Sequence, residues 1–185
     1  MIIGVDLGNK SRNCIAVMDS NYKIYEYSSL TYNAKETTPY EHRQKICKQI
    51  HKYIKKYKLT KNDWLLFEKI SSFMHGYRSK LSNITSLAFI QATLINEFSD
   101  LISISEVAVV SWKAKVLSNM GGTKEDAIDH VKTYYPEINL DIIEHHKRKG
   151  DIIIKNHDLA DAICIAKYGN LVNDLKLKEN LVNYN

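Results

Sequence analysis

The order of apolar and polar segments in this 185-residue chain predicts one α/β domain built around a mixed β-sheet. Three strand-like segments come first, and the polar turns between them are short enough for an antiparallel meander. Helical and strand-like segments then alternate, and a helix that joins two strands of one sheet makes those strands parallel. We therefore expect the first three strands to be antiparallel, the later strands to be parallel, and helices to cover the sheet.

The three N-terminal strands are expected at residues 1–8, 14–18 and 23–30. A helix follows, and its start is marked by a Thr-x-x-Glu capping box from Thr38 to Glu41 with Pro39 at the first helical position. Apolar residues recur on one face of this helix to residue 57, and basic residues occupy much of the rest. We interpret the basic face as solvated surface.

Residues 63–68 are almost continuously apolar and predict a strand covered on both sides of the sheet. The next expected elements are a helix over 82–99 and a strand over 107–110. The helix is apolar on more than one side, because Phe89, Ile90 and Ala92 lie outside its main stripe. Such a helix is buried on more than one side, either within the domain or against a partner subunit.

The C-terminal third is expected to contain helices at 112–118, at 124–135 after a cap at Thr123, and at 158–168. Gly169 is expected to end or break the last of these. Residues 137–157 predict an exposed loop or a hairpin.

The composition is that of a globular protein, with 44% apolar and 25% charged residues. The three cysteines are widely spaced and form no Cys-x-x-Cys pair, which favours a reducing compartment. We expect no export signal, because no basic-then-apolar leader precedes the first strand, and no membrane span, because no apolar run reaches about 18 residues. The net charge of +5 is compatible with a nucleic-acid partner.

Four carboxylates stand at the ends of predicted elements: Asp6 and Glu68 at strand ends, and Asp158 and Asp161 at a helix start. Asp161 is the least expected of them, since it lies within a small apolar run that should pack on the sheet. Charges in such places are costly unless a cation compensates them. Two Mg²⁺ ions about 4 Å apart would relieve the repulsion and could hydrolyse a phosphodiester.

These motifs, Ile2-Ile3-Gly4-Val5-Asp6-Leu7-Gly8, Leu66-Phe67-Glu68 and Asp158-Leu159-Ala160-Asp161-Ala162, resemble those of the RuvC-type Holliday junction resolvases of the RNase H-like superfamily. The chain is most similar to RuvC homologues of bacteriophages that infect low-GC bacteria, which would place it in the host cytoplasm. The resemblance covers a nuclease domain over 1–168 and leaves a C-terminal helix or tail over 169–185. It implies an RNase H-like fold with a five-stranded sheet.

The resemblance also implies a homodimer that nicks four-way, and other branched, DNA in pairs with two Mg²⁺ ions per site. Mn²⁺ should be able to substitute, and no small-molecule cofactor is expected. The catalytic, metal-binding acids would be Asp6, Glu68, Asp158 and Asp161. Lys124 would be one site lysine, and Lys113 or Lys115 the second. The remaining expected DNA-binding side chains are Phe73, Arg78, Lys80, Lys147, Arg148 and Lys149.

The chain departs from the family pattern at three places. Leu7 replaces the usual proline, the aromatic residue after Glu68 is displaced to Phe73, and the segment between Pro136 and Asp158 is longer than usual. His157 could share the last metal-ligand role.

Three other functions compete with this hypothesis. The segment from Gly4 to Ser11 also resembles the phosphate-binding hairpin of actin-like ATPases, but that fold needs two such domains and would leave Glu68 and Asp161 unused. A YqgF-type nuclease would act on RNA. A junction-binding protein without activity would have no reason to keep the carboxylates.

Overall fold

The structure is a computed structural model that describes residues 1–8, 12–33, 35–70, 81–118, 122–146 and 150–173. Its centre is a five-stranded sheet in the order β3-β2-β1-β4-β5. Antiparallel pairing joins β1 to β2 and β2 to β3, whereas β4 lies parallel to both β1 and β5. This topology confirms the predicted fold class. The strands are β1 (Ile2–Leu7), β2 (Arg12–Met18), β3 (Ile24–Thr31), β4 (Trp64–Glu68) and β5 (Ser103–Val107).

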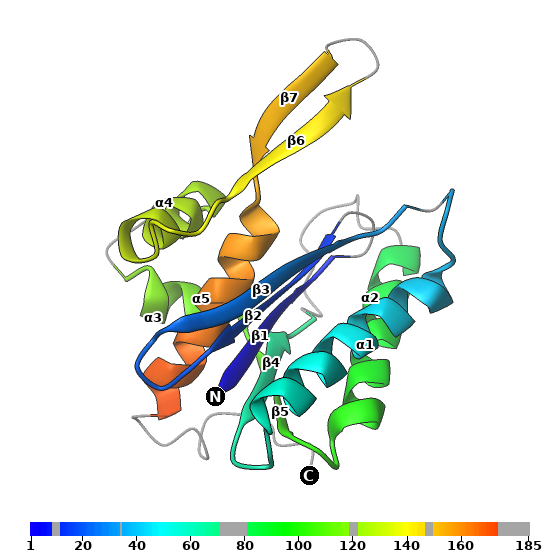
Figure 1. The fold of residues 1–185 in the computed structure, drawn as a ribbon, viewed down its shortest axis with the longest axis vertical. Coiled ribbons are helices and arrows are strands. Elements are labelled where there is room, and N and C mark those ends of the chain that lie inside the picture. Colours follow the sequence, from blue (N-terminus) through cyan, green and yellow to red (C-terminus); the bar gives the residue numbers. More distant parts are fainter. Residues whose placement is uncertain (9–11, 34, 71–80, 119–121, 147–149, 174–185) are drawn as a thin grey trace.

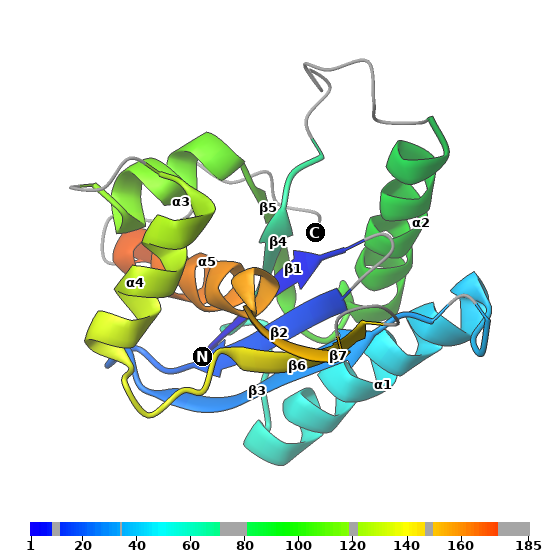
Figure 2. The same ribbon diagram turned by 90° about the horizontal axis from the view of Figure 1, so that it is seen from above.

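Helices cover both faces of the sheet, as Figures 1 and 2 show. The helices α1 (Pro39–Tyr57) and α2 (Leu81–Phe98) lie on one face. The other face carries α3 (Val109–Val116), α4 (Lys124–Tyr134) and α5 (His157–Asn173). A hairpin of β6 (Asp141–His146) and β7 (Gly150–Lys155) projects away from the sheet between α4 and α5. Of the two alternatives predicted for residues 137–157, the structure therefore has the hairpin.

Side-chain alternation along β1 divides the core into two halves. Ile3 and Val5 pack in the cluster beneath α1 and α2, whereas Ile2 packs in the cluster beneath α5. Successive residues of a strand point to opposite faces of a sheet. Gly4 and Asp6 therefore share the α5 face with Ile2.

Both predicted helix starts have the geometry that their sequences indicate. Thr38 Oγ1 accepts a hydrogen bond from the backbone N–H of Glu41, whose carboxylate accepts one from the N–H of Thr38. Thr123 caps α4 in the same reciprocal way with Asp126. Each box satisfies backbone donors that have no partner within the helix.

The predicted strand at 107–110 is wrong. The strand is β5, Ser103–Val107, and α3 begins at Val109. Ser103 and Ser105 gave this stretch a polar pattern, yet both are buried. The Ser103 hydroxyl donates to the carbonyl of Lys61, so its burial costs little. Val110, which completed the apolar run behind the strand prediction, is instead 76% exposed on the surface of α3.

The predicted end of the last helix at Gly169 is also wrong, since α5 continues to Asn173. Gly169 lies where the helix meets the sheet, and a Cβ there would stand 2.5 Å from Leu66 Cδ1 and 2.7 Å from Ile2 Cδ1. The glycine therefore allows close packing rather than ending the helix. The C-terminal segment 174–185 lies outside the described residues.

The apolar excess of α2 is smaller than predicted, because Ile90 is part of the core. Phe89, by contrast, is 60% exposed, and Ala88 and Ala92 are exposed beside it. None of the described helices combines the length and the hydrophobicity of a membrane span.

Candidate active site

Asp6 and Glu68 extend from neighbouring parallel strands at the same edge of the sheet. The register pairs Val5 of β1 with Phe67 of β4, and each carboxylate follows directly after its paired residue. Leu66 packs in the cluster beneath α5, so Glu68, two residues later, lies on the α5 face as Asp6 does. Strand pairing alone therefore brings the two carboxylates together.

The helix α5 crosses this face antiparallel to β1. Its residue Gly169 lies over Ile2, near the start of β1, and its residues Ala162 and Ala166 lie over Gly4. The first turn of α5 must consequently lie over the end of β1, where Asp6 is. Asp158 belongs to that turn, and Asp161, three residues later, is its neighbour on the helix surface. Three elements thus converge with four carboxylates.

The carboxylates influence one another's ionisation. Burial raises the pKa of Asp6 well above its usual value, and the charges of Glu68, Asp161 and Asp158 raise it further. Burial, followed by the charge of Glu68, raises the pKa of Asp161 to about 7. Burial also raises the pKa of Glu68. Like charges that share a poorly solvated site make ionisation unfavourable, and a bound cation would reverse this.

One carboxylate oxygen among these four acids accepts no hydrogen bond from the described residues. Asp161 Oδ1 is buried and has no hydrogen-bond partner among the described residues. Among those residues, no three His, Cys, Asp or Glu side chains are gathered into a ready-made coordination shell. The orphaned oxygen and the all-carboxylate donor set nevertheless fit a hard divalent cation such as Mg²⁺ or Mn²⁺.

Two residues that the sequence did not indicate hold Glu68. The indole Nε1 of Trp112, in α3, donates a hydrogen bond of 2.8 Å to Glu68 Oε1. The side-chain nitrogen of Gln91, in α2, donates one of 2.6 Å to the Glu68 backbone carbonyl. Both are buried. One feature of the sequence could have pointed to Trp112, namely its position next to Lys113, a predicted site lysine. Gln91 lies within the apolar stripe of the helix predicted over 82–99, and nothing in the sequence pointed to a role for it.

The predicted lysines differ in their relation to the carboxylates. The charge of Lys124, at the start of α4, lowers the pKa of Asp6, Glu68 and Asp161. Lys113 lowers the pKa of Glu68 and Asp161 and donates to the Gly122 carbonyl at 2.8 Å. Lys115 is exposed on α3. Lys113 is therefore the better placed of the two alternatives for the second lysine.

Asn156 caps α5 and so positions the two helix aspartates. Its Oδ1 accepts from the Leu159 N–H at 3.1 Å, and its Nδ2 donates to Ser29 Oγ at 2.8 Å. His157 Nδ1 lies 3.4 Å from the Lys124 carbonyl and donates to it, which joins the starts of α4 and α5. Asn156 was not among the residues predicted from the sequence, although an Asn before a helical pattern is a known start signal.

Six predicted DNA-binding residues lie outside the described residues: Phe73, Arg78, Lys80, Lys147, Arg148 and Lys149. Their placement therefore stays a prediction.

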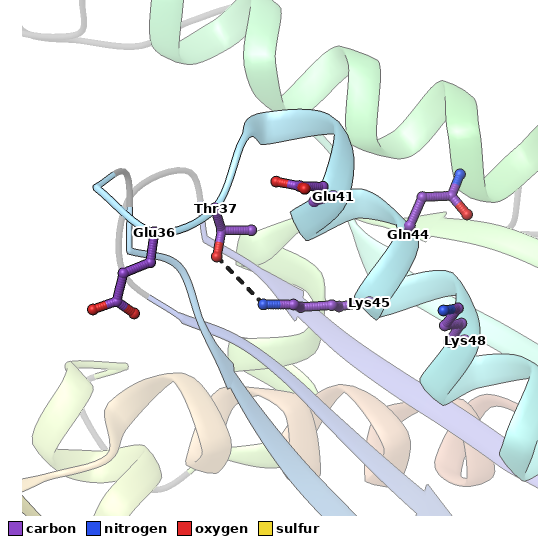
Figure 3. A pocket seen from close by; sticks show the side chains of 6 residues that line it. All are labelled: Glu36, Thr37, Glu41, Gln44, Lys45 and Lys48. Carbon is purple, nitrogen blue, oxygen red and sulfur yellow. Dashed lines mark hydrogen bonds between the residues drawn. The ribbon is translucent and has the colours of Figure 1, made fainter.

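A pocket of about 290 Å³ lies away from the carboxylates, at the start of α1 on the other side of the sheet (Figure 3). Lys45 Nζ donates to Thr37 Oγ1 at 3.3 Å across it. Its charged lining residues, Glu36, Glu41, Lys45 and Lys48, are all exposed, so it is a polar surface hollow without a buried reactive group.

Comparisons with known proteins show where this fold recurs. No family model and no curated protein matches the sequence. Among solved structures, RuvC of Thermus thermophilus has a TM-score of 0.63 at 12% identity, over 94% of this chain and 95% of that chain. T. thermophilus RuvC in complex with a Holliday junction substrate has a TM-score of 0.61 at 12% identity, over 95% of both chains. A yeast mitochondrial Holliday junction resolvase has a TM-score of 0.48 at 17% identity, over 97% of this chain and 81% of that one. The chain therefore has the RuvC fold, and at these identities the likeness is one of fold.

Proposed function

We propose that this protein is a metal-dependent endodeoxyribonuclease that resolves four-way (Holliday) junctions, and other branched DNA, by paired nicks. The observation that carries the proposal is the convergence of Asp6, Glu68, Asp158 and Asp161 at the ends of β1 and β4 and the start of α5. The shared fold supports it, because one of the similar structures contains a Holliday junction substrate.

The four carboxylates would hold two Mg²⁺ ions, or Mn²⁺ in their place. His157 could add a nitrogen ligand, since its Nδ1 donates to the Lys124 carbonyl and leaves Nε2 available. When bound, the ions supply the Lewis acidity for phosphodiester hydrolysis. The orphaned Oδ1 of Asp161 and the mutual repulsion of the acids support this ligand set.

The cationic side chains next to the carboxylates would act on the phosphate. Lys124 and Lys113 carry positive charge close enough to lower the pKa of Glu68 and Asp161. A phosphate bound among the carboxylates would therefore lie within the field of both ammonium groups. Such preorganised charges stabilise the negative charge that develops during hydrolysis.

Paired nicking on a two-fold DNA substrate is most simply performed by a two-fold protein. We propose a homodimer through α2, on which Phe89, Ala88 and Ala92 form an exposed apolar face. Residues 71–80 and 147–149, which lie outside the described residues, would hold the junction arms. The Lys-, Ile-, Asn- and Tyr-rich composition favours a bacteriophage source and action in the cytoplasm of its host.

Cleavage of defined substrates tests the proposal. A synthetic four-way junction, a three-way fork, a linear duplex and an RNA hairpin would be incubated with the protein, with and without Mg²⁺. We expect symmetric nicks in the four-way junction and weaker cutting of the fork, only with Mg²⁺, and none by a Glu68→Gln control. Preferential cutting of the RNA hairpin would instead support the YqgF-type alternative, and metal-independent binding without cleavage would contradict the enzyme assignment.

A further inference from the structure

Trp112 contacts the candidate site through a single polar atom. It is fully buried in α3, within the cluster beneath α5, and its Nε1 donates to Glu68 Oε1 at 2.8 Å. Tryptophan is bulky, and when it is buried its N–H needs a partner. Here the partner is a carboxylate 44 positions away in sequence, at the end of β4, an interior strand of the sheet.

Glu68 is held at two points. Gln91 binds its backbone carbonyl from α2, on one side of the sheet, and Trp112 binds its carboxylate from α3, on the other. The next residue continues the pairing with β5, since the Lys69 N–H donates to the Val107 carbonyl at 2.8 Å. The strand end and one carboxylate oxygen are thus both fixed, which leaves Oε2 as the oxygen that can turn to a ligand.

We propose that Trp112 is a positioning residue for cation binding: its indole N–H holds Oε1 of Glu68 so that Oε2 is presented to a divalent cation. This inference rests on the proposed function. An indole suits the role because it donates one hydrogen bond, accepts none and carries no charge that would repel the ion. The ammonium of Lys113 lies 5.4 Å from the centre of the Trp112 ring, so the same ring also contacts a site lysine.

The substitution Trp112→Phe tests the proposal, because it keeps an aromatic ring and removes the N–H. Mn²⁺ binding to the full-length protein would be measured by isothermal titration calorimetry without DNA. We expect the dissociation constant to rise roughly tenfold or more, as when a residue that orients a metal ligand is lost. The Mn²⁺ concentration for half-maximal junction cleavage should rise with it, and the rate at saturating Mn²⁺ should largely recover.

Trp64→Phe is the matched control. Trp64 is the other of the two tryptophans in the chain and lies at the opposite end of β4 from Glu68. Four residue-to-residue steps along the strand separate the two by roughly 13 Å. Its substitution should leave the Mn²⁺ dissociation constant unchanged.

A spectroscopic measurement can still refute the proposal if Trp112→Phe fails to fold. In the Trp64→Phe protein, Trp112 is the only tryptophan, and paramagnetic Mn²⁺ bound at Glu68 should quench its fluorescence with the same concentration dependence as in calorimetry. Mn²⁺ binding without quenching, or an unchanged dissociation constant in folded Trp112→Phe, would overturn the role of Trp112 and leave the proposed nuclease intact. A wild-type protein that binds no Mn²⁺ would overturn both.

Discussion

The carbonyl oxygen of Ala162 in α5 lies directly over Gly4 in β1, so closely that a Cβ at Gly4 would be 2.3 Å from it. The same Cβ would be 2.5 Å from the Ala166 backbone nitrogen. No side chain fits at such distances. The missing side chain of Gly4 therefore sets the separation of α5 from the sheet, and with it the position of Asp161 relative to Asp6.

Gly4→Ala should destabilise the protein by about 3 kcal/mol, because helix backbone cannot move aside as the end of a side chain can. It should also lower cleavage by displacing the first turn of α5. Gly169→Ala is the matched substitution: the atoms nearest to its Cβ would be side-chain methyl groups of Leu66 and Ile2, which shift more easily than backbone, and we expect a loss of about 1 kcal/mol. Urea denaturation of both variants measures the difference. Equal losses would contradict this account of Gly4.

Asp161→Asn should lower the cleavage rate by roughly a thousandfold or more, while junction binding is kept or strengthened. The metal-free variant should also be more stable than the wild type, by about 1 kcal/mol, because a buried charge among like charges is removed. Single-turnover cleavage and thermal unfolding in EDTA test the two effects. Asp100→Asn, at an exposed turn before β5, should change neither. Wild-type cleavage by the Asp161 variant would refute the proposed ligand set.

The basic residues should divide into two kinds. Lys124→Met should lower the cleavage rate of bound junction by roughly a hundredfold with little change in affinity, since its charge acts at the carboxylates. Neutralising Lys147, Arg148 and Lys149 together should weaken binding and reduce its salt dependence, because such contacts release counterions. Lys115→Met, at an exposed position of α3, is the control and should leave the rate at saturation unchanged.

Single-turnover rates at saturating protein, measured beside a salt titration of binding, separate rate from affinity. A Lys124 variant that loses only junction affinity would show that the residues have been assigned to the wrong roles. So would a triple variant of Lys147, Arg148 and Lys149 that loses only cleavage rate.

Phe89→Asp should dissociate the proposed homodimer, weakening self-association by roughly tenfold or more, since it places a charge in the centre of an apolar interface. Sedimentation should show a wild-type particle of twice the mass of one chain and a monomeric variant that leaves junctions singly nicked. Ile153→Asp, at a 69% exposed apolar position on the hairpin, should remain dimeric. A wild-type monomer, with and without junction, would exclude this dimer.

His130 should contribute a loss of stability as the pH drops from about 6.5 towards 4, whereas the raised pKa values of Asp6, Glu68 and Asp161 act in the opposite direction over that range. Burial, and then the charge of Lys167, lowers the pKa of His130 to about 4; its Nε2 accepts from Lys167 Nζ at 2.9 Å, and the ring of Tyr134 packs beside it. The unfolded chain binds a proton near pH 6.5 and the folded chain only near 4, so acid favours unfolding by an amount on the order of 2 kcal/mol.

His130→Gln should remove that part of the pH dependence. His51→Gln, at a surface position where His51 pairs with Glu97, should keep the wild-type profile. Urea denaturation between pH 4.5 and 7.5 measures both profiles, and identical slopes for the wild type and the His130 variant would contradict the assignment.

The local sequence pattern was sufficient for the elements whose signals lie within a few residues. The capping box at Thr38, the meander and the order of strands and helices are encoded by neighbours three or four positions apart, and all are present in the structure. The positions of Asp6 and Glu68 at the ends of apolar runs were likewise sufficient to place both at one edge of the sheet, because parallel strands end together.

Only the tertiary structure decided the features that depend on distant contacts. Ser103 can be buried in β5 because its hydroxyl donates a hydrogen bond to the Lys61 carbonyl. The helix α5 continues through Gly169 because Ile2 and Leu66 pack against that residue. Lys113 is half-buried on α3 and its charge lowers the pKa of Glu68 and Asp161, whereas Lys115 is exposed, a difference that depends on how α3 packs. Trp112 reaches Glu68 across 44 residues of chain, a separation at which no local periodicity operates; the packing of α3 against the sheet and α5 brings the two together.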